Sequence, residues 1–256
     1  MDLSRLLAWV QDTSPTVVLT TREGRYPRRV QPITCEVIPP TLPAILLACG
    51  AREVYADGGA APLARQWTEP AVRRHSARPF PLGDPPASRR SVLGLGAGRD
   101  LPVNPAATEM AQLIQALSHL LRTGKLTSEE YEDTRKMFVE TAAVQLTAID
   151  CTACGVCVRA CPAGALHLVK NSHHARLIHD RTLCTGAGRC VHLCPYTALG
   201  ATTLTGADVI RQPLGVLATG SVTSCRRCGT DFFGDGAYCP TCTRTQADPF
   251  TSWTRM

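Results

Sequence analysis

Short apolar runs alternate with polar turns along the first 72 residues, the pattern of a small α/β domain. Apolar residues at helical spacing predict helices, and β-branched runs bounded by turn residues predict strands. Because the two kinds of element alternate, we expect a partly parallel sheet. The predicted elements are a helix over 1–11, strands over 16–21 and 30–37, a helix over 42–51 and a strand over 53–56. The predicted core residues are Val17, Val18, Leu19, Ile33, Ile45, Leu46, Leu47 and Val54.

Arginine, proline and glycine are dense in residues 73–105, which we interpret as a linker. Its glycine run, Gly94, Gly96 and Gly98, lacks the lysine of a phosphate-binding loop and the spacing of a dinucleotide-binding motif. The run therefore predicts a connector. An acidic docking partner and a solvated linker explain the arginines of this segment equally well. These arginines are Arg73, Arg74, Arg78, Arg89 and Arg90.

A helical hairpin is predicted over 106–147. Its first helix ends at Gly124, and its second begins at Thr127, which forms a capping box with Glu130. The apolar side of the first helix consists of Met110, Leu113, Ile114, Leu117, Leu120 and Leu121. The apolar side of the second consists of Tyr131, Met137, Phe138 and Val144. We expect this hairpin to pack against the segment that follows it.

Seven of the thirteen cysteines lie in two related runs within residues 150–201. The first run has the spacing C-x2-C-x2-C-x3-C followed by proline, and consists of Cys151, Cys154, Cys157, Cys161 and Pro162. Thirty-three residues later the pattern returns as Cys184, Cys190, Cys194 and Pro195, but Ala187 stands where Cys154 would recur. Apolar alternation between the runs, about Asn171, predicts a β-hairpin. The spacing is that of iron–sulfur ligands; zinc sites or disulfides are the weaker alternative.

Residues 148–201 resemble a two-cluster bacterial ferredoxin that has lost one ligand. In that spacing the fourth cysteine of each run ligates the other cluster, so the ligand sets cross. The first set is Cys151, Cys154, Cys157 and Cys194, which predicts a 4Fe–4S cluster. The second set is Cys161, Cys184 and Cys190, which predicts either a 3Fe–4S cluster or a 4Fe–4S cluster with one iron bound by something other than cysteine.

Five histidines accompany the two runs, and we assign them to the surface or to indirect roles around the clusters. His192 lies within the second run, but the vacant ligand position is that of Ala187. The five are His167, His173, His174, His179 and His192.

Residues 202–222 predict a second linker of loops or short strands, and four cysteines follow within 223–245. Cys225, Cys228, Cys239 and Cys242 have the spacing C-x2-C-x10-C-x2-C. Two such knuckles bring four thiolates to one closed tetrahedral site. The segment resembles zinc ribbons and rubredoxin-type knuckles. We predict zinc, the common occupant of small closed four-thiolate sites, with iron as the alternative.

The N-terminal stretch is similar to the delta-subunit family of methyl-viologen-reducing hydrogenases. The similarity lies in the order of VQPITC, LLACGA and REVYADG. It implies a domain that carries a 2Fe–2S cluster and passes electrons to a flavin-bearing or catalytic partner. Cys35 and Cys49 are the only cysteines of this stretch, and residues 57–61 supply none. We therefore predict two buried apolar thiols in a docking domain without a cofactor.

Charge and composition further limit the functional classes and the cell location that the sequence predicts. The chain has 27 basic and 21 acidic residues, a formal charge of +6 and 44% hydrophobic residues. Thiolate-ligated clusters are anionic, so the loaded protein is expected to be near neutral, and we infer no nucleic-acid binding. Cysteines in metal-type clusters predict a reducing, cytoplasmic location. We expect neither a signal peptide nor a membrane span, because no apolar run is long enough.

The predicted fold class is an α+β multidomain chain: a small N-terminal α/β domain over 1–72, a helical hairpin, a two-cluster ferredoxin-like unit and a C-terminal four-cysteine ribbon. The leading interpretation is a non-catalytic electron-transfer subunit. It would relay electrons to redox partner proteins within a larger oxidoreductase, of the hydrogenase or heterodisulfide-reductase kind.

Two alternatives stay open. In the first, an open iron of the second cluster is a Lewis acid in an enzyme, with only Asp180 and the histidines as nearby acids or bases. In the second, the ribbon senses redox state or binds nucleic acid. The residues for that second alternative are Phe232, Phe233, Tyr238, Arg226, Arg227 and Arg244.

Overall fold

The computed structural model describes residues 3–22, 26–57, 61–68, 75–77, 79–82, 84–86, 101–171 and 173–247. The chain forms two compact units, Met1–Phe138 and Val139–Met256. The elements of the first unit are α1 (Ser4–Thr13), β1 (Thr16–Thr20), β2 (Tyr26–Pro27), β3 (Val30–Thr34), α2 (Leu42–Ala48), β4 (Glu53–Asp57), β5 (Arg65–Gln66), β6 (His75–Ala77), β7 (Phe80–Pro81), α4 (Glu109–Arg122) and α5 (Ser128–Lys136).

A five-stranded sheet in the order β5-β4-β1-β3-β7 forms the centre of the first unit, and all of its pairings are parallel. β1 is the middle strand, and its apolar residues Val17, Val18 and Leu19 are fully buried. The predicted α/β character and the positions of the early elements are confirmed. Of the predicted core residues, Leu47 alone is half-buried. Pro32 is tolerated in β3 because β7 pairs only with Ile33 and Thr34, so the missing amide of Pro32 can face an unpaired edge.

The predicted linker over 73–105 is partly wrong, because some of it belongs to the fold. β6 pairs with β2, and β7 is the edge strand of the parallel sheet. The ring of Phe80 in β7 and the ring of Trp9 in α1 form a T-shaped pair with a centroid distance of 5.4 Å. Aromatic pairs of this geometry stabilise a fold beyond the area that they bury. The predicted glycine run over 94–98 and the arginines of this segment lie outside the described residues.

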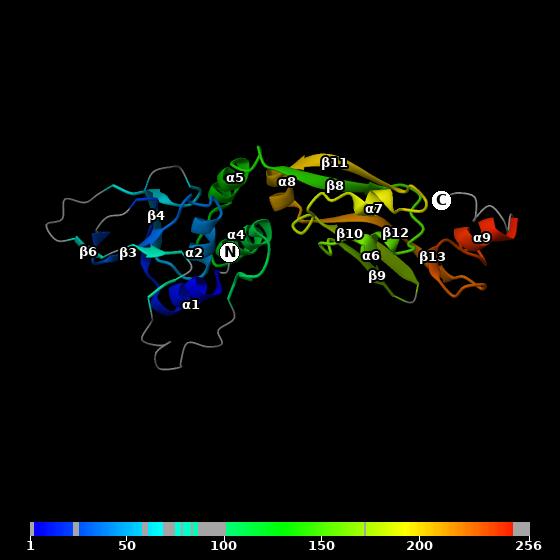
Figure 1. Cartoon of the computed structure of the whole chain (residues 1–256), viewed down its shortest axis with the longest axis horizontal. Coiled ribbons are helices and arrows are strands. Elements are labelled where there is room, and N and C mark those ends of the chain that lie inside the picture. The colour runs from blue at the N-terminus through cyan, green and yellow to red at the C-terminus, as the bar shows by residue number, and fades with distance from the viewer. Residues whose placement is uncertain are drawn as a thin grey trace. The chain divides into compact units, whose positions relative to one another are not determined.

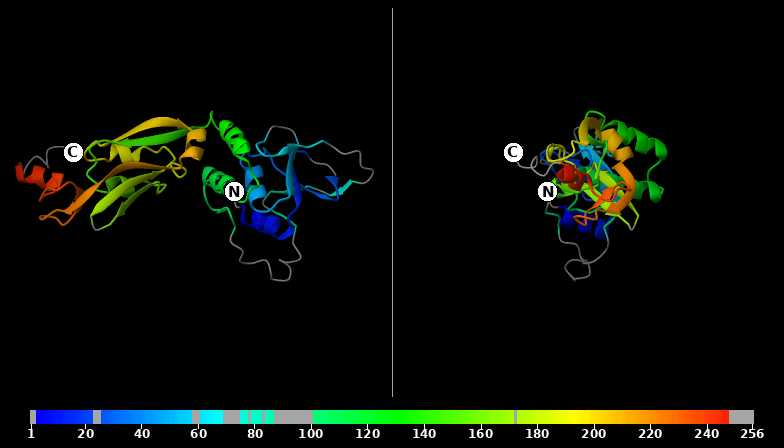
Figure 2. Two further views of the ribbon diagram at one scale, coloured as in Figure 1. Left: turned by 180° about the vertical axis from the view of Figure 1, so that it is seen from behind. Right: turned by 90° about the vertical axis from the view of Figure 1, so that its right-hand side faces the viewer.

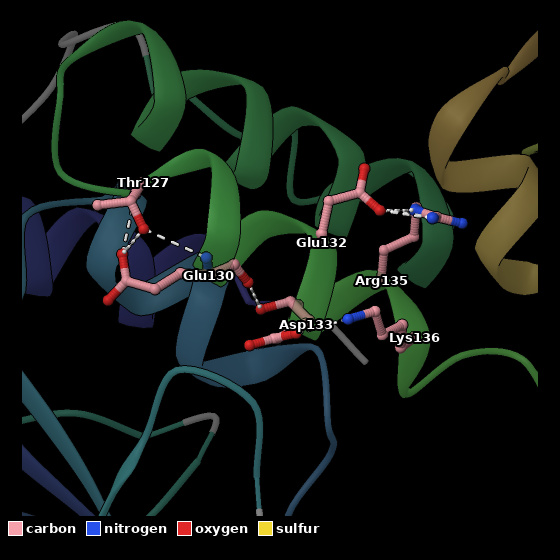
Figure 3. A network of polar contacts seen from close by, with 7 residues as sticks. Thr127, Glu130, Glu132, Asp133, Arg135 and Lys136 are labelled. Atoms are coloured by element: carbon pink, nitrogen blue, oxygen red, sulfur yellow. Dashed lines mark hydrogen bonds and ion pairs between the residues drawn. The ribbon is translucent and has the colours of Figure 1, made fainter.

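The helices α4 and α5 belong to the first compact unit. In Figure 1, α2 lies between the sheet and α4, and the Thr41 hydroxyl before α2 donates to the Glu109 carboxylate in the first turn of α4 at 2.6 Å. The predicted capping box is confirmed: Thr127 and Glu130 exchange hydrogen bonds at the start of α5 (Figure 3). The expectation that the second helix continues to Val144 is wrong, because residues 142–148 form a strand.

The second unit contains the cysteine runs and the knuckle. Its elements are β8 (Ala142–Ala148), α6 (Val156–Ala160), β9 (Leu166–Lys170), β10 (His174–Asp180), α7 (Arg189–His192), β11 (Leu199–Thr205), α8 (Gly206–Arg211), β12 (Leu214–Ser224), β13 (Asp231–Phe233) and α9 (Pro240–Ala247). β8 and β11 form an antiparallel pair, and β13, β12, β10 and β9 form a four-stranded sheet in that order. The predicted hairpin is confirmed as β9 and β10.

The predicted second linker over 202–222 is wrong. These residues contain α8 and the long strand β12, which pairs with β10 along most of its length and then with β13. The sequence of β12, LGVLATGSVTS, is rich in small residues, so its intrinsic strand preference is weak. Pairing on both sides overrides that weak preference. α8 and α9 lie at opposite ends of the second unit in the views of Figure 1 and Figure 2.

Leucines and cysteines share the core of the second unit. Four leucines from four strands surround two of the predicted ligands, Cys157 and Cys190. The leucines are Leu146, Leu166, Leu177 and Leu199. In the described part of the chain, no helix combines the length and apolar character that crossing a bilayer requires.

Candidate iron–sulfur and metal sites

The two cysteine loops repeat one backbone conformation. Ala153 and Gly155 flank Cys154 with φ of 57° and 70°. Gly186 and Gly188 flank Ala187 with φ of 72° and 69°. Positive φ is costly for a residue with a Cβ, so two loops that share it at matching positions are built alike. The second loop therefore retains the shape of the first although its second cysteine is absent.

The first site is a narrow cavity lined by four cysteines. Cys151, Cys154 and Cys157 come from the first run and Cys194 from the second, as the crossed ligand assignment expects. Leu168, Leu177, Tyr196 and Leu199 are among the other residues that line this cavity. The donor set of four thiols in apolar surroundings fits a 4Fe–4S cluster.

Burial is the main influence on the pKa values of the Cys151 and Cys157 thiols. It raises the pKa of Cys151, and together with the neighbouring thiols of Cys151 and Cys154 it raises the pKa of Cys157 to about 11. Without metal, such thiols are protonated at neutral pH. Iron must therefore displace protons when it binds, and cluster assembly is expected to release them.

The second site is a wider cavity of about 250 Å³. Cys161, Cys184 and Cys190 line it, as does Ala187 at the position without a thiol. Burial, followed by the nearby thiols of Cys161 and Cys184, raises the pKa of Cys190. Three thiolates in this arrangement fit a 3Fe–4S cluster or a 4Fe–4S cluster with one non-cysteine ligand. The other walls come from β8 and β11, with Val144, Leu146, Ala201, Thr202 and Thr203.

Backbone amides donate hydrogen bonds to the sulfurs of Cys161 and Cys194, the last cysteine of each run, which lines the cavity of the other run. The amide of Ala165 donates to Sγ of Cys161 at 3.3 Å, and the amide of Ala198 donates to Sγ of Cys194 at 3.3 Å. Ala165 and Ala198 occupy matching positions of the repeat. Hydrogen bonds to ligand sulfurs are one of the determinants of the reduction potential of an iron–sulfur cluster, and these two amides would supply a matched pair of them.

The four cysteines of the knuckle converge on one point. The sulfurs of Cys225, Cys228, Cys239 and Cys242 all lie within 4.8 Å of one another. Although burial raises the pKa of Cys225, hydrogen bonds from the backbone of Cys239, Cys228 and Arg227 lower it to about 6. Three of these cysteines are buried and Cys228 is exposed. These four cysteines fit a metal ion that accepts thiolate ligands in a tetrahedral arrangement.

Cys35 and Cys49 lie apart from these sites, in the first unit. Both are buried, and burial raises the pKa of Cys35 to about 11 and of Cys49 to about 12. Such thiols are inert packing groups at neutral pH, as predicted.

The histidines do not line either cysteine cavity. His167, His173, His174 and His192 are exposed, and the ring of His192 lies beside Gly188. His179 was not distinguished from the others by its sequence, yet it is fully buried in β10 and neither ring nitrogen has a hydrogen-bond partner. Its burial, which depends on pairing with β9 and β12, has no local sequence signal.

Replacing His179 by leucine is expected to make stability less sensitive to acid. Burial, followed by the charge of Arg181, lowers the pKa of His179, while the carboxylate of Asp180 opposes this. Above the ordinary histidine pKa the ring is neutral in both states and adds no pH dependence. As the pH falls below that value, the unfolded chain binds the proton first and the free energy of unfolding decreases. Denaturant unfolding of the wild type and the variant between pH 7.5 and 5.5 tests this.

The exposed His174 on the same strand provides the control for that experiment. A His174→Gln variant should keep the acid sensitivity of the wild type. If His179→Leu also keeps it in full, the buried ring is not the group responsible.

Residues 150–198 match the family model of the 4Fe–4S dicluster domain. No curated protein matches the chain. The match covers both cysteine runs and supports an iron–sulfur domain. It does not extend to the N-terminal stretch, so the similarity to the hydrogenase delta subunits gains no support from it.

Sequence reasoning missed two residues at the first site. Tyr196 lines the cavity, and Thr152 lies within the loop with its hydroxyl buried and unpartnered. Tyr196 follows the cysteine–proline pair directly, a proximity that the sequence shows but that does not by itself indicate a role.

Proposed function

We propose that the second unit is an electron-transfer module with two iron–sulfur clusters, a 4Fe–4S cluster at the first site and a cluster with three cysteine ligands at the second. The observation that carries this proposal is the interlocking of the two cavities. Each cysteine run lines both, and Cys157 of one site and Cys190 of the other belong to one buried core. Two redox centres in one apolar core are suited to passing electrons from one to the other.

The lining of the second cavity favours a relay over an enzyme. Apart from the cysteines, Arg189 is the only ionisable side chain among the described residues that line it. Neither Asp180 nor a histidine belongs to that lining. Lewis-acid catalysis at an open iron would require a positioned proton donor or acceptor, which this lining does not supply.

The knuckle offers little support for nucleic-acid binding. Phe232 is buried against Cys225, Cys239 and Cys242, and Phe233 is half-buried. Tyr238 is 40% exposed, and it is the one exposed aromatic side chain of the described knuckle. Stacking of bases requires accessible aromatic faces, so a structural zinc ion in the knuckle fits these observations better.

We propose a place for the module in the cell on the basis of its chemistry. It would accept electrons from one redox protein and pass them to another, as a subunit of a larger oxidoreductase of the hydrogenase or heterodisulfide-reductase kind. The first unit would provide a docking surface for such a partner. A reducing cytoplasm is the compartment in which free thiols and exposed clusters persist.

Electron paramagnetic resonance of the anaerobically purified protein, oxidised and then reduced, tests the proposal, with iron and zinc counted on the same sample. We expect about seven or eight irons per chain, clusters that are reduced reversibly, and one zinc. A strong signal in the oxidised state identifies a 3Fe–4S cluster. Silence when oxidised, with a signal only on reduction, identifies two four-iron clusters. Absence of iron after anaerobic reconstitution would refute the proposal.

A further inference from the structure

The four-cysteine knuckle is attached to the loop of the first site. β13 of the knuckle pairs with β12, and the amide of Phe233 then donates to the carbonyl of Thr152 at 3.1 Å. Thr152 lies between the predicted ligands Cys151 and Cys154. The neighbouring side chain, Phe232, packs on the knuckle cysteines. Adjacent residues of one short strand therefore contact the knuckle site and the first cysteine loop.

A second contact comes from the other half of the knuckle. The hydroxyl of Thr241 lies 2.5 Å from the hydroxyl of Tyr196. Thr241 stands between Cys239 and Cys242, and Tyr196 lines the first cavity two residues after Cys194. The middle strand of the knuckle and its second cysteine pair are thus both connected to residues at the first site.

An ion pair supports the same arrangement. Nζ of Lys170 at the end of β9 lies 3.3 Å from the carboxylate of Asp231 in β13. The same carboxylate accepts a hydrogen bond from Ser224, the residue before Cys225. None of the residues that line the second cavity belongs to the knuckle, and neither Thr152 nor Tyr196 is among them.

We propose that the metal-loaded knuckle is a cover that holds the loop of the first cluster and sets its reduction potential, while the second cluster is independent of it. This inference rests on the proposed electron-transfer function. It assigns positioning roles to Thr241, Tyr196 and the amide of Phe233.

The physical argument begins with the small core of the knuckle. Three cysteines and Phe232 form it, too few apolar groups to hold the segment folded without metal. When the metal is lost, the segment loosens and water reaches the hydroxyl of Thr152, which is buried in the intact fold. Water stabilises the more highly charged reduced cluster, so the reduction potential of the first cluster rises.

Cys228→Ser is the variant that tests the cover, because Cys228 is the exposed ligand and its replacement disturbs packing least. Metal content and the reduction potentials of both clusters are measured by anaerobic redox titration followed by electron paramagnetic resonance. We expect loss of the knuckle metal, a more positive potential of the first cluster and faster loss of its iron to a chelator. The potential of the second cluster should not change.

Thr241→Val tests the contact with Tyr196 without removing a knuckle cysteine. It removes the hydroxyl that lies beside the Tyr196 hydroxyl, so the knuckle should keep its metal. The reduction potential of the first cluster should become more positive, by less than in Cys228→Ser. Thr245→Val is the matched control: it makes the same change one turn later in α9, where the hydroxyl donates only to the carbonyl of Thr241. The control should leave both potentials unchanged.

Two results would overturn the inference. One is loss of the knuckle metal with both potentials unchanged. The other is an equal shift of both potentials, which would indicate general loosening of the unit. In either case, a wild-type protein that binds two reversibly reducible clusters would retain the proposed function, so the two failures are distinguishable.

Discussion

Replacing Cys154 by serine is expected to remove the first cluster from the protein. Cys154 is the middle cysteine of its loop, held by flanking residues with positive φ. Cys151, Cys157 and Cys194 line the same cavity. A serine hydroxyl is a poorer ligand for iron than a thiolate. We expect iron to fall by about four atoms per chain, and cluster absorbance to fall with it, while the signal of the second cluster persists.

Cys49→Ala is the control for that variant, since it removes a buried thiol that belongs to the first unit and to neither predicted ligand set. It should retain the full iron content. Unchanged iron and absorbance in Cys154→Ser would show that Cys154 is not a ligand. Loss of both clusters would instead show that the second site depends on the first for its assembly.

Replacing Ala187 by cysteine is expected to complete the second site. Gly186 and Gly188 already hold this loop in the conformation that Ala153 and Gly155 give the first loop. The new thiol would therefore stand where Cys154 stands at the first site, beside a cavity of about 250 Å³. If the wild type holds a 3Fe–4S cluster there, iron should rise from about seven to about eight atoms per chain. The signal of the oxidised protein should disappear, because an oxidised four-iron cluster is silent.

Ala201→Cys tests whether any added thiol would suffice. Ala201 also lines the second cavity, but from β11, and no ligand occupies the matching position at the first site. It should leave the iron count and the spectrum as in the wild type. If Ala187→Cys leaves a three-iron cluster unconverted, the crossed ligand assignment is wrong.

The two cysteine runs show how much of the candidate site can be predicted from local sequence pattern. Their spacing and repeat lead directly to two ligand sets, and the structure brings the members of each set to one cavity. The ligand assignment itself stays a proposal until iron is bound and counted. Two other predictions from local sequence are confirmed by the structure: the capping box of Thr127 and Glu130, and the hairpin about Asn171. Each depends on a few adjacent residues.

Predictions failed where distant residues decide the outcome. The weak strand preference of β12 is overcome by its partners β10 and β13. The second predicted helix ends early because Ala142–Ala148 pairs with β11, far along the chain. The composition of the Arg-rich segment predicts a linker throughout, yet β7 within it completes the edge of the parallel sheet. In each case tertiary pairing outweighs local propensity.

By itself, the sequence determined the iron–sulfur character of residues 150–198, because cysteine spacing is a local property that needs no knowledge of distant contacts. It also determined the α/β character of the first unit, since apolar periodicity is read within each element. The tertiary structure alone decided that α4 and α5 belong to the first unit, that His179 is buried without a partner, and that the knuckle contacts the loop of the first site. These features depend on residues far apart in the chain, whose meeting is set by the packing of whole elements.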